Sequence, residues 1–202
     1  MIGLPKKVVM ASSNAGKITE IARLLDGLAI DVVSQSELGV SDADETGETF
    51  AENSLIKAHH ACRATGLAAI ADDSGLVVDA LDGRPGVYSA RYAGPSATDD
   101  ENIDKLLSEL SGVSDDARGA AFYCVASFVM PGERSAVVSE GVWRGTLLKA
   151  RRGNGGFGYD PIFLDPSSGL SAAQLTPQQK NARSHRGQAL RGLVTQLHQK
   201  FE

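Results

Sequence analysis

Residues 67–75, Leu-Ala-Ala-Ile-Ala-Asp-Asp-Ser-Gly, constrain the fold of this chain more than any other stretch. The small apolar residues up to Ala71 are typical of a buried strand, which would carry Asp72 and Asp73 at its tip. Adjacent carboxylates repel each other, so such a pair usually needs a cation or a shared proton. Mg²⁺ is the hard cation that suits oxygen ligands and phosphate substrates. The alternative interpretation is a turn, because Asp-Asp-Ser-Gly also has turn composition.

Length and charge limit the class of protein. A chain of 202 residues suggests one compact domain or two closely packed lobes. The formal charge of −5 argues against a general nucleic-acid-binding surface, which needs a basic footprint. We expect no signal peptide and no membrane span, and therefore a cytoplasmic protein. Cys62 and Cys124 lie in apolar patterns and are expected to be core residues.

The N-terminal region has the pattern of a strand, a polar loop and a helix. Residues 6–11 predict the strand, and Ile18, Ile21, Ala22 and Leu25 have helical spacing. Between them, residues 12–17 (Ser-Ser-Asn-Ala-Gly-Lys) lie where free N–H groups and a helix dipole favour phosphate. The loop is not a P-loop, and an ordinary turn with a solvated Lys17 is the alternative.

An acid-rich loop precedes the next predicted helix. A strand over residues 30–33 leads into a loop with Asp42, Asp44, Glu45 and Glu48, which is either solvated or supplies a second metal ligand. Thr49 and Glu52 form a capping box that predicts a helix to about Thr65, ended by Gly66. Asn53 and Lys57 share one face of this helix, where Lys57 could face a site or be a surface lysine.

The second half of the chain predicts a hairpin, a glycine-rich loop and terminal helices. Strands over 120–130 and 136–143 joined by a turn indicate a mixed sheet. In the loop at 153–161, Phe157 and Tyr159 offer faces for a base, and a flexible linker is the alternative. Thr176 and Pro177 start a helix, and residues 184–187 interrupt the helical pattern before the last helix. His185 and Arg186 would by base rates be surface residues.

Taken together, these segments resemble one family. Seven of them occur in its order over nearly the whole chain: residues 12–17, 45–47, 49–53, 71–75, 85–92, 155–161 (Gly-Gly-Phe-Gly-Tyr-Asp-Pro) and 184–187 (Ser-His-Arg-Gly). The chain resembles the Ham1-like inosine/xanthosine triphosphate pyrophosphatases, which act on non-canonical purine nucleotides.

The resemblance implies a fold and an activity. The fold is α/β, with a mixed β-sheet flanked by helices and two lobes with a central active-site cleft. Residues 1–202 would form a single catalytic domain, usually as a homodimer. The activity is Mg²⁺-dependent hydrolysis of ITP, dITP and XTP, by attack of water at the α-phosphorus, to the monophosphate and pyrophosphate.

The resemblance also assigns roles to residues. Asp73 matches the general base and a metal ligand, with Asp72, Lys17 and Lys57 as further catalytic residues. The acidic loop matches a metal-binding region, where relatives often have two glutamates. Asp44 is one methylene shorter than glutamate, which leaves open whether Asp44 or Glu45 reaches the ion. The implied substrate contacts are Ser12, Ser13, Asn14, Ala15, Gly16, Lys17, Ser74, Phe157, Gly158, Tyr159, Asp160, Lys180, His185 and Arg186.

Selection of the base needs hydrogen-bond donors aimed at the 6-oxo group, which hypoxanthine and xanthine share and adenine lacks. His185 and Arg186 are the candidate donors. Guanine also has a 6-oxo group, so exclusion of GTP must depend on its 2-amino group. In the phosphate loop, Ser13 stands where many relatives have glycine, which restricts the backbone.

Three other functions compete with this interpretation. A Maf-like pyrophosphatase for another modified nucleotide would share the chemistry but not the Ser-His-Arg-Gly and Gly-Phe-Gly-Tyr-Asp segments. A nucleotide-binding regulator would bind ITP without consuming it, and the acids and lysines argue against it. A nucleic-acid-binding role is the least favoured, given the acidic charge balance.

Overall fold

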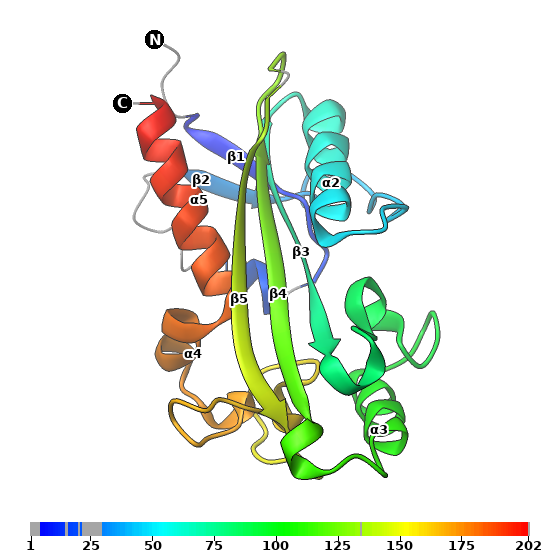
Figure 1. Ribbon diagram of the computed structural model, residues 1–202. Helices are drawn as coiled ribbons and strands as arrows, with labels where there is room; N and C mark the ends of the chain where they lie inside the picture. Colours follow the sequence, from blue (N-terminus) through cyan, green and yellow to red (C-terminus); the bar gives the residue numbers. More distant parts are fainter. Residues whose placement is uncertain (1–4, 15, 20, 22–29, 134, 202) are drawn as a thin grey trace. The chain divides into compact units, whose positions relative to one another are not determined.

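The computed structural model describes residues 5–14, 16–19, 21, 30–133 and 135–201 (Figure 1). One sheet has the strand order β2-β1-β3-β4-β5-β6. β1 pairs in parallel with both β2 and β3, and β5 pairs antiparallel with β6, so the predicted mixed sheet is confirmed. The strands and helices are β1 (Lys7–Met10), β2 (Asp31–Ser34), α2 (Phe50–Thr65), β3 (Ala68–Val78), α3 (Asp99–Glu109), β4 (Gly119–Val129), β5 (Val137–Leu147), β6 (Phe163–Leu164), α4 (Pro177–Arg183) and α5 (His185–Phe201).

The central strand is longer than the turn interpretation allows. β3 continues without a break through Asp72, Asp73, Ser74 and Gly75 to Val78. The turn interpretation of these four residues is therefore wrong. β1 pairs with the start of β3 at residues 68–70, and β4 is the neighbour on its other side, so sheet pairing of the strand outweighs the turn preference of the four side chains.

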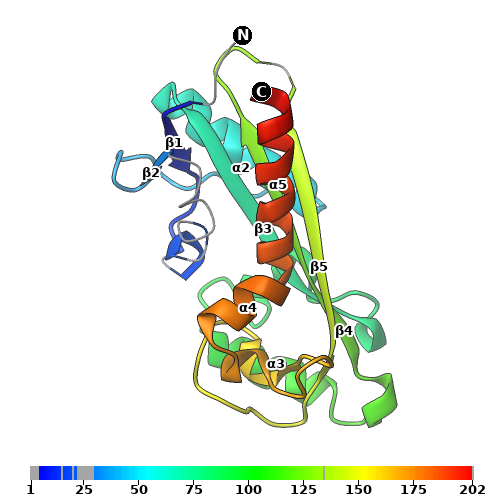
Figure 2. The ribbon, with the colours of Figure 1, turned by 90° about the vertical axis from the view of Figure 1, so that its left-hand side faces the viewer.

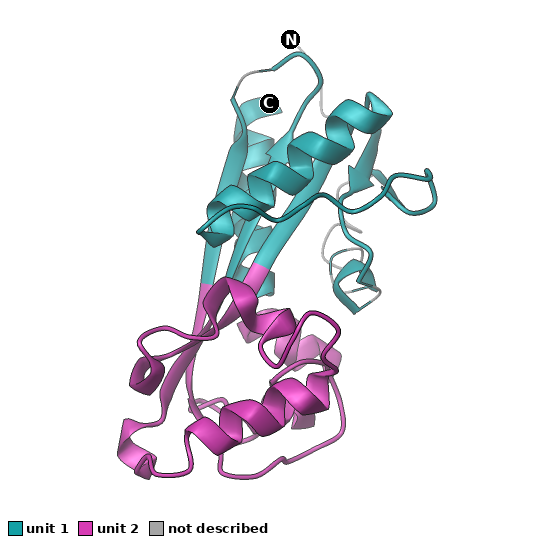
Figure 3. Ribbon diagram, turned by 90° about the vertical axis from the view of Figure 1, so that its right-hand side faces the viewer, with its two compact units in different colours: residues 1–73, 124–141, 185–202 teal, residues 74–123, 142–184 magenta. Residues whose placement is uncertain are grey.

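The chain divides into two compact units (Figure 3). Unit 1 contains residues 1–73, 124–141 and 185–202, and unit 2 contains residues 74–123 and 142–184. The boundaries fall within β3, β4 and β5, so each of these strands contributes residues to both units.

In unit 1, the alternation of side chains along the strands separates two hydrophobic clusters. Val8, Met10, Ala68 and Ile70 pack with Cys124, Phe128 and the α5 residues Ala189, Leu190, Leu193 and Leu197. The intervening residues Val9, Ala11, Ala69 and Ala71 pack instead with Ala58, Ala61 and Cys62 of α2. Successive residues of a strand point to opposite faces, so α5 and α2 cover opposite faces of the sheet (Figure 2). A side chain of α2 or α5 that points toward the sheet can therefore reach only the face that its helix covers.

Helix α2 begins and ends where its sequence predicts. Thr49 and Glu52 form both bonds of the capping box, and Gly66 follows the last turn with φ of 69°. In the N-terminal region, residues 16–19 and 21 are helical, whereas the predicted helical residues Ala22 and Leu25 lie outside the described residues.

Unit 2 has its own core, built around aromatic residues of three strands. Phe122, Trp143 and Phe163 lie together, with the centroid of the Phe163 ring 4.6 Å from that of Phe122 and 4.9 Å from that of Trp143. Ile103, Leu106 and Leu110 in and just after α3 pack onto this cluster. The helix that presents the acidic residues 99–101 is thereby fixed within the unit.

The sequence predicts a break over residues 184–187, but the break between α4 and α5 is limited to Ser184, and residues 185–187 already belong to α5. Thr176 caps α4 and Pro177 is its first residue, while Ser184 is extended and α5 starts at His185. His185 and Arg186 are 5 % and 2 % exposed, so their interpretation as surface residues is wrong. Cys62 and Cys124 are buried free cysteines, as expected. Among the described helices, none has the length and apolar character needed to cross a membrane.

Candidate functional site

Asp73 lies on the face of β3 that α2 covers. Lys57 of α2 donates one hydrogen bond to Asp73 Oδ1 at 2.8 Å and another to Glu45 Oε1 at 2.9 Å. The Lys57 side chain is 13 % exposed, so its interpretation as a surface lysine is wrong. One ammonium group thus holds the strand carboxylate and the acidic loop together.

Asp72 lies on the opposite face, with different partners. Its Oδ2 is 3.2 Å from Lys17 Nζ and 3.2 Å from Arg186 Nε at the start of α5. The Cys124 thiol also donates to this oxygen, at 3.9 Å. Both Asp72 and Arg186 are almost fully buried. Because a strand turns neighbouring side chains to opposite faces, the two adjacent acids have separate cations rather than a shared one.

These environments shift the pKa values of the two carboxyl groups in opposite directions. Burial raises the pKa of Asp72, but the charges of Lys17 and Arg186 outweigh burial and hold it well below its usual range. Burial also raises the pKa of Asp73, and Lys57 offsets this only in part. Burial lowers the pKa of Lys57, but Asp73, Asp72 and Glu45 together raise it above its ordinary value. Lys57 is therefore an ammonium group that two carboxylates share.

The acidic loop is fastened to α2 along its length. Ser41 O is 2.9 Å from His60 Nε2, Glu45 bonds Lys57, and the Gly47 N–H donates to Asn53 Oδ1 at 2.8 Å. A Cβ added at Gly47 would lie 2.7 Å from that oxygen, so the loop needs glycine there. Asp44 is exposed, and within the described residues its carboxylate forms no hydrogen bond or ion pair. Glu45 is thus the acid of this loop that the structure brings beside Asp73.

The phosphate-loop candidates form a compact turn after β1. Asn14 Oδ1 accepts from the Lys17 N–H at 3.1 Å and Ser12 Oγ accepts from the Asn14 N–H at 3.2 Å, so both side chains order the entry to the helical residues. The Ser13 hydroxyl donates to Asp42 Oδ2 at 2.7 Å. Gly16 begins the helical residues, while Ala15 lies outside the described residues.

The remaining candidates of unit 2 gather at the glycine-rich loop. Lys180 Nζ lies 2.6 Å from Asp160 Oδ2 and 4.7 Å from the centroid of the Phe157 ring. The Phe157 N–H donates to the same Asp160 oxygen at 2.9 Å. These contacts favour an ordered loop over the alternative of a flexible linker. Tyr159 is buried, and its hydroxyl donates to Ser89 O at 2.9 Å, so it packs inside the unit rather than offering a face to a base.

The predicted site residues thus form two clusters, one in each unit. Unit 1 brings together Lys17, Glu45, Lys57, Asp72, Asp73 and Arg186, and places His185 beside Arg186 at the start of α5. Unit 2 brings together Phe157, Asp160 and Lys180, with Gly158 in the same loop. Ser74 follows Asp73 in β3 and begins unit 2.

The donor set of unit 1 fits a divalent cation carried by a polyphosphate. Asp73 and Glu45 already converge on one positive charge, and carboxylate oxygens suit Mg²⁺. Among the described residues, no three acidic, histidine or cysteine side chains lie close enough together to hold a metal by themselves. Mg²⁺ sites in nucleotide enzymes commonly use one or two carboxylates plus substrate phosphates, which two acids satisfy.

Two contributing acids were missed from the sequence. Asp42 binds Ser13 across 29 positions, and Asp99 accepts from the Gly158 N–H across 59 positions. Asp42 could have been suspected from its place in the acidic loop. Asp99 follows the helix cap Thr98, and an acidic residue is common in the first turn of a helix. The sequence therefore contains no indication that Asp99 contacts the glycine-rich loop.

Carboxylates paired with lysines, together with an aromatic residue in a glycine-rich loop, fit a protein that binds a polyphosphate-bearing ligand. Comparison with known proteins identifies the particular family. The chain belongs to the Ham1 family, whose match covers residues 8–196.

Relatives match nearly the whole chain. The dITP/XTP pyrophosphatase of Methylococcus capsulatus is 55 % identical over 193 residues, which are 95 % of this chain and 96 % of the relative. That of Salmonella typhimurium is 54 % identical, over 95 % of this chain and 98 % of the relative. A solved HAM1 protein from Coxiella burnetii has 48 % identity and a TM-score of 0.88, over 96 % of this chain and 98 % of that one. The Staphylococcus aureus Ham1 protein has 41 % identity and a TM-score of 0.86, over 96 % and 100 %.

Proposed function

We propose that this protein hydrolyses ITP, dITP and XTP to the nucleoside monophosphate and pyrophosphate, and so removes deaminated purines from the nucleotide pool. The observation that carries the proposal is the 55 % identity, over 95 % of the chain, to a relative named dITP/XTP pyrophosphatase. The carboxylates and lysines that unit 1 brings together support the proposal.

In the proposed reaction, Asp73 is the general base. It accepts a proton from a water molecule whose oxygen bonds to the α-phosphorus, and the bond from that phosphorus to the bridging oxygen breaks, releasing pyrophosphate. A pKa raised by burial suits this role, because a base works best when its pKa approaches the operating pH. Lys17 and Lys57 neutralise charge on the phosphates, and Asp72 orients Lys17.

Mg²⁺ is the proposed cofactor, held by Asp73 and Glu45. When bound, it supplies charge neutralisation of the triphosphate. Of the two acids considered for the second ligand, we choose Glu45, because it shares the Lys57 ammonium with Asp73 whereas Asp44 is exposed. Residues 12–17 would bind the phosphates through the N–H groups at the start of the helical segment.

The purine would stack on Phe157, with Lys180 beside it. Lys180 lies over the Phe157 ring and bonds Asp160, so one ammonium group can donate toward a 6-oxo acceptor at the ring that stacks the base. His185 and Arg186 remain the other proposed donors. Adenine would present an amino group to such donors and leave them unpaired, which disfavours ATP.

We further propose that the protein acts in the cytoplasm, that it binds no nucleic acid and that it forms a homodimer, as the family resemblance implies. The formal charge of −5 supports the absence of nucleic-acid binding, because phosphate backbones attract basic surfaces.

An isotope experiment with one variant tests this mechanism. In water enriched in oxygen-18, attack at the α-phosphorus places the label in inosine monophosphate, and label in pyrophosphate would contradict it. Asp73→Asn should fold normally and lose at least about a hundred-fold in kcat, the scale of a missing general base. Asp31→Asn is the matched control, because the Asp31 carboxylate lies in an exposed pair with Lys7 at 3.7 Å. Near-normal turnover by Asp73→Asn would remove the assigned role.

A further inference from the structure

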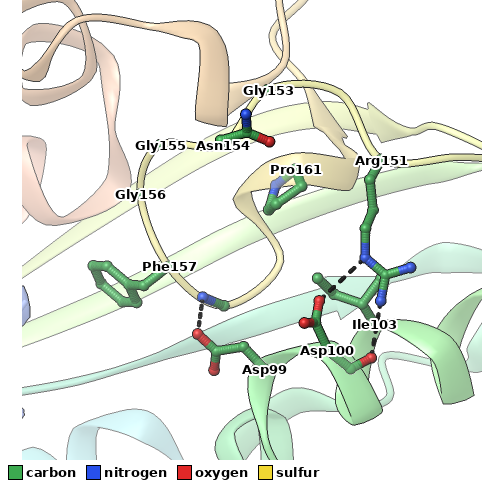
Figure 4. A pocket seen from close by; sticks show the side chains of 11 residues that line it. Asp99, Asp100, Ile103, Arg151, Gly153, Asn154, Gly155, Gly156, Phe157 and Pro161 are labelled. Carbon is green, nitrogen blue, oxygen red and sulfur yellow. Dashed lines mark hydrogen bonds and ion pairs between the residues drawn. The ribbon is translucent and has the colours of Figure 1, made fainter.

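The loop that carries Phe157 arches over a cavity. The cavity has a volume of about 370 Å³ and is lined by the loop, by Arg151 and Pro161, and by Asp99, Asp100 and Ile103 of α3 (Figure 4). Gly153, Gly156 and Gly158 have φ of 79°, 76° and 57°, a region that costs glycine little. A glycine-rich loop over a cavity needs bonds to its backbone to hold one shape.

Two carboxylates supply such bonds on either side of Phe157. Asp160 Oδ2 accepts from the Phe157 N–H at 2.9 Å, and Asp99 Oδ2 accepts from the Gly158 N–H at 2.6 Å. The peptide groups before and after the Phe157 Cα are therefore both fixed. Because the backbone fixes the direction of the Cα–Cβ bond, these two bonds set the direction in which the Phe157 side chain leaves the loop.

The two carboxylates differ in what else they do. Asp160 is 2 % exposed and also bonds Lys180, so its loss would disturb the ring and the lysine together. Asp99 is exposed and stands in the first turn of α3, whose Ile103 and Leu106 are buried in the core of unit 2. The backbone of Asp99 is therefore held by α3, and its carboxylate forms one hydrogen bond to the loop.

We propose that Asp99 is a positioning residue for recognition of the purine base: it holds the Phe157–Gly158 peptide so that the ring is preset for stacking. This inference rests on the proposed function. Asp99 need not touch the substrate; it acts through the Gly158 N–H. Its removal should weaken binding of the base, leave phosphate binding unchanged, and leave the chemical step largely intact.

Steady-state hydrolysis of ITP by Asp99→Ala and Asp99→Asn tests the proposal. Loss of one exposed charge-assisted hydrogen bond should raise KM about five-fold in Asp99→Ala with kcat nearly unchanged. Asp99→Asn keeps an acceptor oxygen and should restore most of the affinity. Asp104→Ala is the control, because Asp104 lies on the same helix and pairs with Arg151 at 2.8 Å instead of with the loop.

Two inhibitors separate base positioning from a general structural effect. The inhibition constant of inosine should rise about five-fold in Asp99→Ala, and that of pyrophosphate, which has no base, should not change. Equal weakening of both inhibitors, equal effects of Asp104→Ala, or an unchanged KM in an active Asp99→Ala enzyme would overturn the proposal. A wild-type protein that hydrolyses no purine triphosphate would instead refute the proposed function, and this inference with it.

Discussion

At the scale of single residues, the two adjacent aspartates of β3 have different tasks. Asp72 is buried against Lys17 and Arg186, which keep it ionised, whereas Asp73 shares the Lys57 ammonium with Glu45. The sequence predicted that both acids would lie at one site. It could not predict that strand alternation gives each its own cations, because the turn interpretation of residues 72–75 left their directions open.

The shared Lys57 ammonium predicts how activity responds to pH. In the proposed reaction the active form of Asp73 is the carboxylate, so kcat/KM should fall as the pH drops through its pKa, which burial raises above the ordinary value of about 3.9. Lys57 lowers that pKa, so in Lys57→Gln the acid limb of the residual activity should move to higher pH. The pH–rate profiles of both proteins measure this shift. Lys105→Gln, at a half-exposed lysine paired with Glu109, should leave the limb in place. A limb that stays or moves to lower pH in Lys57→Gln would show that another group controls it.

At the scale of elements, the acidic loop depends on α2 for its shape. The helix was predictable in detail, since the capping box at Thr49 and the terminal Gly66 both act as expected. The bonds from the helix to the loop were not, because a polar loop without periodicity carries no signal for which side chains it meets. Asn53 shows this: its helical face was predictable, but its bond to the Gly47 N–H was not.

Gly47→Ala tests the dependence of the proposed metal site on this loop. The added Cβ would lie 2.7 Å from both Asn53 Oδ1 and Glu52 Cβ, so the loop must shift and Glu45 with it. We expect the Mg²⁺ concentration for half-maximal activity to rise about ten-fold, as for other changes that misplace a metal ligand. Gly112→Ala is the control, because a Cβ there meets nothing within 4 Å. Unchanged Mg²⁺ dependence in Gly47→Ala would exclude Glu45 as a ligand.

At the scale of the whole molecule, the chain forms two compact units with separate cores. The mixed sheet followed from the sequence because short apolar runs and turn residues mark its strands. The burial of His185 and Arg186 did not follow from the sequence, since charged side chains are usually exposed. For Arg186 the exception depends on a tertiary partner, the carboxylate of Asp72.

The pKa of Asp72 is lowered and that of Asp73 is raised, so the two carboxylates should contribute differently to the free energy of unfolding. The depressed pKa of Asp72 means that its ionised form contributes stability above about pH 4, which is lost as the pH falls through the folded-state pKa. Asp72→Asn removes the carboxylate that Lys17 and the buried Arg186 both face, and should lower the free energy of unfolding at pH 7 by about 3 kcal/mol. The difference from the wild type should shrink below pH 4. Asp73→Asn removes a carboxylate that burial disfavours and should change that free energy by less than about 1 kcal/mol.

Urea unfolding of the wild type and both variants at pH 7 and in acid measures these differences. Similar losses in the two variants at pH 7 would show that the two faces of β3 are not electrostatically distinct.

Release of pyrophosphate from ITP, XTP, dITP, GTP and ATP, with Mg²⁺ and then with EDTA, tests the central claim most directly. We predict rapid release from the first three nucleotides, little from GTP and ATP, and none with EDTA. Equal turnover of all five would retain the metal site but remove the account of base selection. Tight binding of ITP without any release would contradict the proposed activity and indicate a nucleotide-binding regulator.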